Sequence, residues 1–147
     1  MAFQGETNSF LLELWSGIHD FTSDTFKLAL YTSSASLTED TTAYSATNEA
    51  SGTNYSAGGV TLSLASGYPQ VVTHNNIKRL EVRFDDATWD DATITDYQYG
   101  LIFNSSQSNK AFFVLNFGGL QSVTADTLTI NLAALDKPLT FMARPQS

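Results

Sequence analysis

The sequence LEVRFDDATWDDATITDYQYGLIFN, residues 80–104, contains two arms with the two-residue periodicity of β-strands. In the first arm Leu80, Val82 and Phe84 alternate with polar residues, which predicts a strand with one buried face. In the second arm, residues 94–103, apolar side chains occur at both odd and even positions, as in a central strand covered on two sides. We therefore expect the two arms to form a broad β unit on which the other strands build.

The connection between the arms is rich in carboxylates and holds one tryptophan, Trp89. Its acidic residues are Asp85, Asp86, Asp90 and Asp91. Because charged side chains avoid the core, we expect an exposed turn whose single large ring folds back onto the arms. The spacing lacks the alternating register and the closing glutamate of a known calcium loop, so we interpret these carboxylates as solvated. A weak cation site and the paired acids of a glycosidase are the alternatives.

The overall composition favours one all-β domain spanning residues 1–147, because 42% of the chain is hydrophobic and only 15% is charged. The polar remainder is mostly Thr, Ser and Asn, which suits strands and turns. Seven basic and fifteen acidic residues give a net charge of −8, which repels phosphate backbones and anionic lipids. We therefore expect no nucleic-acid partner and no membrane partner.

Three absences in the sequence narrow the function further. The chain contains no cysteine, which excludes thiol catalysis, thiolate metal sites and disulfides. It contains no apolar run of the roughly 18 residues that a membrane-spanning helix needs, and its first ten residues do not resemble a secretory signal. We therefore expect a soluble protein that is made in a cytoplasm.

The N-terminal region predicts the only helix. Residues 1–8 are polar, and we expect them to be flexible. Over residues 9–17 apolar side chains recur at spacings of three and four, which predicts a short helix capped by Asn8 or Ser9. A helix of this length is marginal alone, so it must dock by its apolar face, and we expect Trp15 to be the anchor.

Strands are expected along most of the remaining chain. Beyond the two arms they are predicted at residues 25–32, 60–64, 68–75, 110–117, 125–132 and 139–142. In the first of these, Phe26, Leu28 and Leu30 face the core and Tyr31 faces outward. Gly118 and Gly119 are expected to end one strand. Seven or eight strands with one leading helix predict an antiparallel β-sandwich, with the jelly roll as one form of it.

Residues 33–59 form a segment of Ser, Thr, Ala, Asn and Gly that is unusually long for an idle loop. We expect it to be an extended loop or arm that binds a partner or is ordered by one. Its apolar anchors, together with the helix tryptophan, are our predicted partner contacts. These residues are Leu37, Tyr44, Tyr55 and Trp15.

Catalytic chemistry is not indicated by the sequence. Only His19 and His74 could act as bases near neutral pH, and neither has a suitably spaced nucleophile or orienting group. We interpret both as structural or surface residues. The aromatic residues of the later strands follow strand periodicity and lack interleaved Lys or Arg, which favours core packing over a stacking platform for sugars or bases. We expect no enzyme activity, catalytic residue, cofactor or metal.

Four stretches carry a resemblance to a known family. They are NSFLLELWSGIHDFTSDTFKLALYTSSASL (8–37), TTAYSATNEASGTNYSAGGVTL (41–62), DDATWDDATITDYQYGLIFN (85–104) and NKAFFVLNFGG (109–119). In this order they resemble a family of small structural proteins of tailed-bacteriophage virions. The resemblance implies a capsid decoration (cement) protein that binds the outer surface of the head and stabilises contacts between major capsid subunits.

The same resemblance leaves a second position in the virion open, as a tail or fibre-base interaction module. In either position it implies a virion location and a homo-oligomer, either a dimer or a trimer. The implied partner on the head is the major capsid protein. A glycan-binding or glycan-hydrolysing domain is a third alternative, and it would depend on Asp90 or Asp91.

Overall fold

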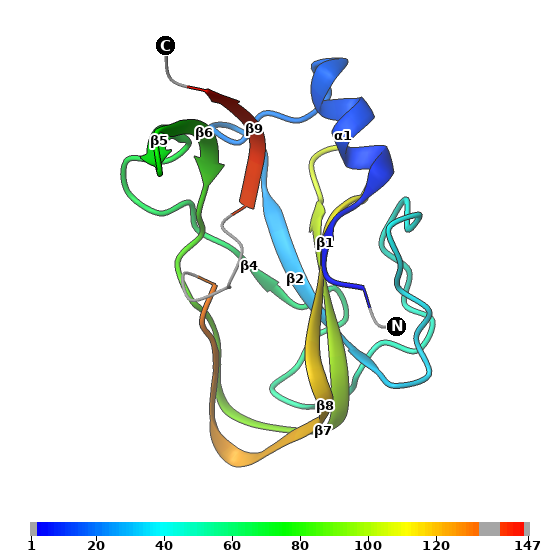
Figure 1. Cartoon of the computed structure of the whole chain (residues 1–147). Helices are drawn as coiled ribbons and strands as arrows, with labels where there is room; N and C mark the ends of the chain where they lie inside the picture. The colour runs from blue at the N-terminus through cyan, green and yellow to red at the C-terminus, as the bar shows by residue number, and fades with distance from the viewer. Residues whose placement is uncertain (1–2, 133–138, 146–147) are drawn as a thin grey trace.

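The structure, a computed structural model, describes residues 3–132 and 139–145, and it is mostly antiparallel β with one short helix (Figure 1). The predicted all-β, sandwich-like fold class is therefore confirmed. The elements are β1 (Gly5–Glu6), α1 (Asn8–Trp15), β2 (Phe26–Thr32), β3 (Gly52–Thr53), β4 (Val60–Thr61), β5 (Gln70–His74), β6 (Ile77–Val82), β7 (Ala87–Asn104), β8 (Lys110–Ile130) and β9 (Leu139–Pro145).

The strands form two sheets. A six-stranded sheet has the order β1-β8-β7-β2-β4, with β3 also paired to β7, and a three-stranded sheet has the order β5-β6-β9. The two arms of the opening stretch therefore lie in different sheets, and the expectation of one broad β unit is wrong. The reason is local: Asn75 and Asn76 both adopt positive φ, which suits a tight hairpin, so β6 pairs with β5 rather than with β7.

The β7–β8 hairpin is longer than the sequence predicts. The strand β7 has 18 residues and begins at Ala87, so most of the expected acidic turn is strand. The strand β8 has 21 residues and continues through Gly118, where we expected an end. Bulges account for this continuity, because the register shifts several times and Asp91, Asp96 and Gly118 adopt positive φ. The hairpin consequently curves, and its far half turns toward the opposite side of the molecule (Figure 1).

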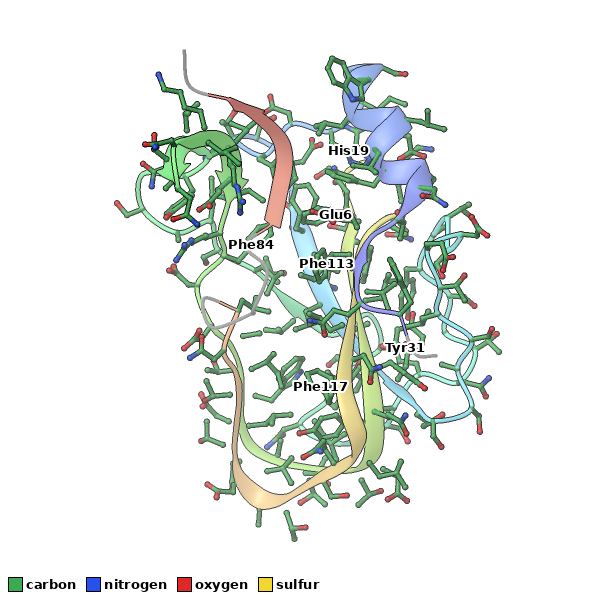
Figure 2. The ribbon with its side chains drawn as sticks, viewed as in Figure 1. Glu6, His19, Tyr31, Phe84, Phe113 and Phe117 are labelled. Carbon is green, nitrogen blue, oxygen red and sulfur yellow. The ribbon has the colours of Figure 1, made fainter. Side chains whose placement is uncertain are left out.

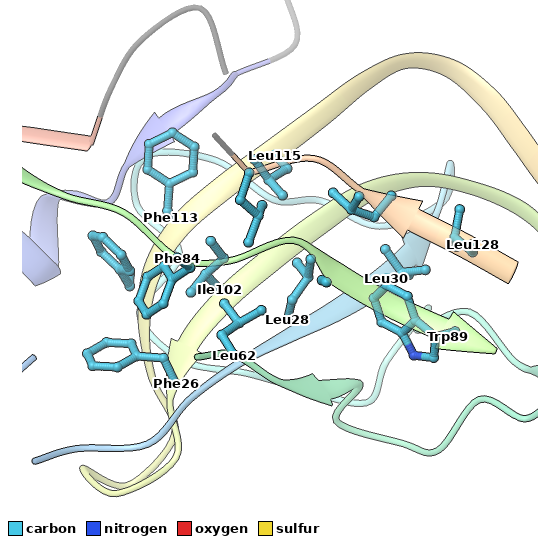
Figure 3. Packing of buried hydrophobic residues seen from close by; sticks show 14 of the residues in the cluster. Phe26, Leu28, Leu30, Leu62, Phe84, Trp89, Ile102, Phe113, Leu115 and Leu128 are labelled. Atoms are coloured by element: carbon cyan, nitrogen blue, oxygen red, sulfur yellow. The ribbon is translucent and has the colours of Figure 1, made fainter. Parts of the chain in front are cut away.

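The main hydrophobic core lies between the six-stranded sheet and the side of the molecule that carries β6. Figure 3 shows Phe26 beside Phe84 and Trp89 beside Leu30 within this core. The predicted inward face of β2 is confirmed, and so is the burial of Trp89. Glu81 is one of the polar residues that alternate with Leu80, Val82 and Phe84, for which the pattern predicts the exposed face, and it is fully buried instead.

A second, smaller cluster lies on the other face of the sheet. It contains Tyr31, which is only 1% exposed although the alternation of its strand placed it outward. Residues 33–59 explain the difference, because Leu37 and Tyr44 pack against this cluster. In Figure 1 this segment, drawn in cyan, runs along the side of the sheet away from β5 and β6. The segment is thus a long loop, as one of the two expected alternatives has it, and it covers the chain's own sheet rather than extending away from it as an arm.

The N-terminal residues are better ordered than expected. Gly5 and Glu6 pair with β8, so the expectation of a flexible stretch is wrong for them, while residues 1–2 lie outside the described part of the chain. The helix α1 begins one residue early, because Thr7 is its cap and the Thr7 hydroxyl accepts a hydrogen bond from the backbone N–H of Phe10. In the described residues no helix is long and apolar enough to cross a membrane.

Candidate interaction surface

The helix α1 presents an apolar face to solvent. Leu12 is 72% exposed and Trp15 is 77% exposed, and their spacing of three places both side chains on the same side of the helix. Leu11, at 37% exposed, adjoins them. The prediction that Trp15 docks the helix onto the sheet is therefore wrong. Large apolar side chains gathered at one place on a surface are typical of a contact site for another molecule.

Phe10 anchors the helix in place of the tryptophan. Its side chain is fully buried, and its ring centroid lies 4.3 Å from that of Phe112 and 5.9 Å from that of Phe21. The ring of His19 also packs against Phe10, with the two ring centroids 4.9 Å apart. Aromatic pairs at such distances add to the free energy of simple burial. The helix is therefore fixed through one face, while Leu12 and Trp15 remain on the other.

A polar network fixes the end of the helix as well. Glu13 accepts hydrogen bonds from His19 Nε2 at 2.8 Å and from Lys110 Nζ at 3.0 Å, which joins α1 to the start of β8. The amide Nδ2 of Asn104 lies 3.0 Å from His19 Nδ1 and 2.7 Å from Asp24 Oδ2. Because a carboxylate only accepts, the Asn104 amide must donate to both, and His19 is the neutral tautomer with its proton on Nε2.

The burial of His19 determines whether a substrate can reach this network. The side chain of His19 is fully buried beneath the helix (Figure 2), and both of its ring nitrogens are engaged, so no substrate can reach it. This placement agrees with the structural interpretation of His19, whereas the side chain of His74 lies outside the described part. Burial raises the pKa of Asp24, but hydrogen bonds from Asp20, Asn104 and Gln107 outweigh it, and the net pKa is lowered.

The predicted contact residues of the 33–59 segment pack on the chain itself. Tyr44 stacks on Phe103 with ring centroids 4.6 Å apart, and Tyr55 stacks on Trp89 at 6.0 Å. Leu37 lies against the same cluster as Tyr44. All three side chains are partly buried, so each keeps some surface for a partner. Their role in partner binding stays a prediction, and Trp15 is the most exposed of the four.

Glu49 links three positions of residues 33–59 through hydrogen bonds, and the sequence pattern did not lead us to predict this role. Its Oε2 accepts a hydrogen bond of 2.6 Å from the Tyr44 hydroxyl, and its Oε1 accepts bonds of 2.7 Å from the Tyr55 hydroxyl and from the Gly58 backbone N–H. Glu49 is the only charged residue between Asp40 and Lys78. A lone carboxylate flanked by two tyrosines in a neutral loop is the signal that could have identified it.

The phenols around Glu49 are held in the neutral form. Burial, together with the hydrogen bond to Glu49, raises the pKa of Tyr44 to about 12. Burial also raises the pKa of Tyr55 and that of Tyr31, and the Tyr31 hydroxyl donates a hydrogen bond of 2.7 Å to the Ser45 carbonyl oxygen. The cover over the sheet is therefore secured by the buried Tyr31 and by the partly buried Tyr44 and Tyr55.

A shallow pocket of about 260 Å³ opens between this cover and the end of β2. Its lining includes Tyr31, Leu37 and several serine and threonine side chains, with no charged group among them. Fixing a polar ligand usually takes a few convergent polar groups in an enclosed site. The pocket alone therefore does not define a ligand.

The four aspartates of the opening stretch are exposed and do not form a metal site. The side chain of Asn54 donates to the backbone oxygens of Asp90 and Asp91, and Asp90 Oδ1 lies 3.4 Å from the Thr127 hydroxyl. Among the described side chains, which in residues 3–132 exclude that of His74, no group of three or more His, Asp or Glu could hold a metal ion. The exposure of the four side chains agrees with the interpretation of these carboxylates as solvated.

The structure is a sandwich-like β body that presents an exposed apolar face of α1, and the opposite face of this helix packs on the sheet. Comparison of the chain with protein-family models, with curated proteins and with solved structures finds no match.

Proposed function

We propose that the chain is a structural protein of a tailed-bacteriophage virion, and specifically a capsid decoration protein. It binds the outer surface of the head and stabilises contacts between major capsid subunits. The resemblance of the four stretches of sequence supports the virion assignment. The observation that supports a binding role is that Leu12 and Trp15 are exposed together on α1, while Phe10 on the opposite face of the helix is packed in the core.

The fixed helix makes this pair suitable for binding. Phe10 and Glu13 hold α1 against the sheet, so little freedom of the backbone is lost when a partner covers Leu12 and Trp15. Burial of each of these side chains contributes about 1.5–3 kcal/mol, and Trp is among the residues most often found at binding hot spots. Two large apolar side chains are therefore enough for a specific anchor.

The charges near the helix indicate the chemistry of the partner surface. The side chain of Asn8 donates to Asp40 Oδ1 at 3.0 Å, and its backbone N–H donates to the Glu39 carbonyl oxygen at 2.7 Å, which places two acidic residues beside the start of α1. An apolar contact with an acidic rim is best matched by an apolar recess bordered by Lys or Arg. We therefore expect the capsid site to combine these two features.

The test is co-sedimentation of the purified protein with expanded capsids that lack decoration. We expect the wild type to bind and the double variant Leu12→Ser/Trp15→Ser to bind at least about tenfold more weakly, a difference of about 1.4 kcal/mol. The matched control is Val71→Ser/Leu120→Ser, since these side chains are 58% and 57% exposed on other elements. Wild-type binding by the helix variant, or equal loss in the control, contradicts the proposal.

The position in the particle needs a separate measurement. Heads and tails are separated and the copy number of the chain is measured in each by mass spectrometry. A decoration protein is expected in many copies on heads. Its presence in tails alone would reject the head position in favour of the tail or fibre base.

A further inference from the structure

The shallow pocket of about 260 Å³ beside the end of β2 includes no residue of α1, so the proposed function does not use it. Its lining comes from Tyr31 of β2 and from residues between 34 and 48. In Figure 1 this stretch belongs to the cyan segment that runs along the side of the sheet away from β5 and β6. The pocket is therefore a second feature of the surface, with its own chemistry.

Hydrogen bonds within the chain hold the walls of this pocket in place. The Tyr31 hydroxyl donates to the Ser45 carbonyl oxygen at 2.7 Å, which ties the segment to β2. The side-chain amide of Asn48 donates to the Ser34 carbonyl oxygen at 3.0 Å, so the two ends of the lining stretch are joined. A ligand that enters walls already held in this way loses little free energy to their reorganisation.

Several hydroxyl groups of the lining are available to a ligand. Within the described residues, the side-chain hydroxyls of Ser34, Ser36 and Thr47 make no hydrogen bond. The Ser45 hydroxyl accepts from the Thr47 backbone N–H at 3.2 Å and keeps its own proton to donate. All four residues are exposed. Because a hydroxyl can both donate and accept, these groups suit a ligand that is itself rich in hydroxyls.

The rest of the lining is mostly apolar, and none of it is charged. Leu37 and Ala35 pack against the smaller hydrophobic cluster, and Ala43 and Tyr31 add to the apolar part. No Asp, Glu, His, Lys or Arg belongs to the lining. A charged ligand would therefore give up water without gaining an opposite charge, which costs free energy. An uncharged ligand with hydroxyls on its edge and C–H groups on its face matches both parts of the lining.

A sugar ring has this combination of groups. We propose that the pocket binds one neutral sugar residue, with the hydroxyls of Ser34, Ser36 and Thr47 as hydrogen-bond partners and Leu37 in contact with the ring face. The volume is below the roughly 300–1,000 Å³ of sites for drug-sized ligands, so it suits a single ring. Because the pocket is open to solvent, the ring can be the end of a longer glycan.

This site differs from the glycan-binding alternative that the sequence leaves open. That alternative depends on Asp90 or Asp91, which lie on β7 and do not line the pocket. A carboxylate would attract a positively charged amino sugar, whereas a lining without charges does not. The preference for uncharged sugars therefore separates the two sites.

The first test is a titration of the isotope-labelled full chain, followed by the NMR shifts of its backbone amides. The probes are free glucose and the methyl glycosides of glucose, galactose and N-acetylglucosamine, and the charged controls are glucuronate and glucosamine. We expect at least one methyl glycoside to shift the amides of residues 34–48 with a dissociation constant of about 1 mM, as is typical for a ligand of this size. The charged sugars should cause no such shifts.

Several results of this titration would overturn the proposal. They are the absence of shifts with about 100 mM of every probe, shifts centred outside the pocket, and equal binding of charged and neutral sugars. Binding of free glucose without binding of any methyl glycoside would overturn the assignment to the end of a glycan.

The second test removes the free hydroxyls. In the triple variant Ser34→Ala/Ser36→Ala/Thr47→Val no hydrogen bond of the chain is lost, so the fold should be unchanged, as circular dichroism can establish. Each hydrogen bond lost to the sugar weakens binding about two- to tenfold, so this variant should bind at least about tenfold more weakly. The matched control is Thr88→Val/Thr129→Val, a pair of exposed residues opposite each other on β7 and β8.

The single variant Ser36→Ala repeats the test with one substitution and should bind about two- to tenfold more weakly. Equal binding by the wild type and the triple variant, or an equal loss in the Thr88/Thr129 control, overturns the proposal.

The outcome does not depend on the proposed function. Leu12→Ser/Trp15→Ser leaves the pocket unchanged, so it should bind the sugar as the wild type does although it fails to bind capsids. Asp90→Asn/Asp91→Asn should also bind normally, and loss of sugar binding in this variant would assign the sugar to the acidic residues and overturn the proposal. If no sugar binds and the triple hydroxyl variant loses capsid binding, the pocket belongs to the capsid contact instead.

Discussion

The hydroxyl of Tyr44 donates a hydrogen bond of 2.6 Å to the carboxylate of Glu49, five residues further along the chain. The same carboxylate binds Tyr55 and the Gly58 backbone through its other oxygen, so one side chain holds three points of the 33–59 segment. The ring of Tyr44 in turn stacks on Phe103 of β7. The cover over the second face of the sheet therefore depends on Glu49.

Replacement of Glu49 by alanine is expected to lower the free energy of unfolding by about 3 kcal/mol, because three donors lose a charged acceptor at a partly buried site. Urea unfolding followed by fluorescence measures this. Glu39→Ala is the matched control, since Glu39 is exposed and only its backbone oxygen makes a hydrogen bond. A Glu49 variant as stable as the control would show that the carboxylate does not secure the segment.

Stability is expected to fall in alkaline solution. An unfolded tyrosine loses its proton near pH 10, whereas folded Tyr44 has a pKa of about 12, so the unfolded state binds fewer protons between these values. The stabilising contribution is complete below pH 10 and is lost as pH rises toward 12. Unfolding free energies measured over this range, together with the ultraviolet band of tyrosinate, check the direction. Tyr44→Phe should flatten the slope, and an unchanged slope would contradict the assignment to Tyr44.

Phe10 and Trp15 are expected to differ sharply although both lie on α1. Phe10→Ala removes a fully buried ring and should cost about 3–5 kcal/mol of unfolding free energy. Trp15→Ala should change it by less than about 0.5 kcal/mol, because the side chain is mostly in solvent. Thermal unfolding of the two variants makes the comparison. A strongly destabilised Trp15 variant would mean that the tryptophan packs on the protein's own surface.

Alanine substitutions at Gly59 and at Gly67 are expected to distinguish the effect of a steric clash from that of backbone strain. Both have positive φ, 72° and 84°, but a Cβ on Gly59 would lie within 1.7 Å of the Leu28 carbonyl oxygen, whereas at Gly67 nothing lies within 4 Å. Gly67→Ala should cost about 1 kcal/mol, the typical penalty for left-handed backbone. Gly59→Ala should cost several times more and release β4 from β2, as hydrogen exchange of the Leu62 amide can report. Equal losses would show that β4 does not need this close approach.

Periodicity predicted the strands wherever alternation is uninterrupted. The inward face of β2 and the central position of β7 are confirmed for this reason. The bulges of the long hairpin could not be predicted, because an inserted residue such as Asp91 or Asp96 breaks the alternation and resembles a turn. Gly118 was likewise misread as an end, since a glycine at positive φ can either stop a strand or bend it.

The candidate surface was only partly predictable. The helical spacing marked α1 as amphipathic, but Phe10 and Trp15 are both large and apolar, and only the tertiary structure determines which of them is buried. Glu49 was missed because a single charge in a polar loop resembles solvated surface. Tyr31 was placed outward for a related reason, since the segment that covers it has almost no hydrophobic pattern of its own.

The continuous β7–β8 hairpin has a mechanical consequence. Its two strands are bonded to each other from Asn104 and Lys110 at one end to Ala87 and Ile130 at the other, and this single ribbon passes round the core. A pull on one side of the body is thus carried to the other through a ladder of cross-strand hydrogen bonds rather than through a flexible connection. The two ends of this hairpin should accordingly yield together when the protein is pulled.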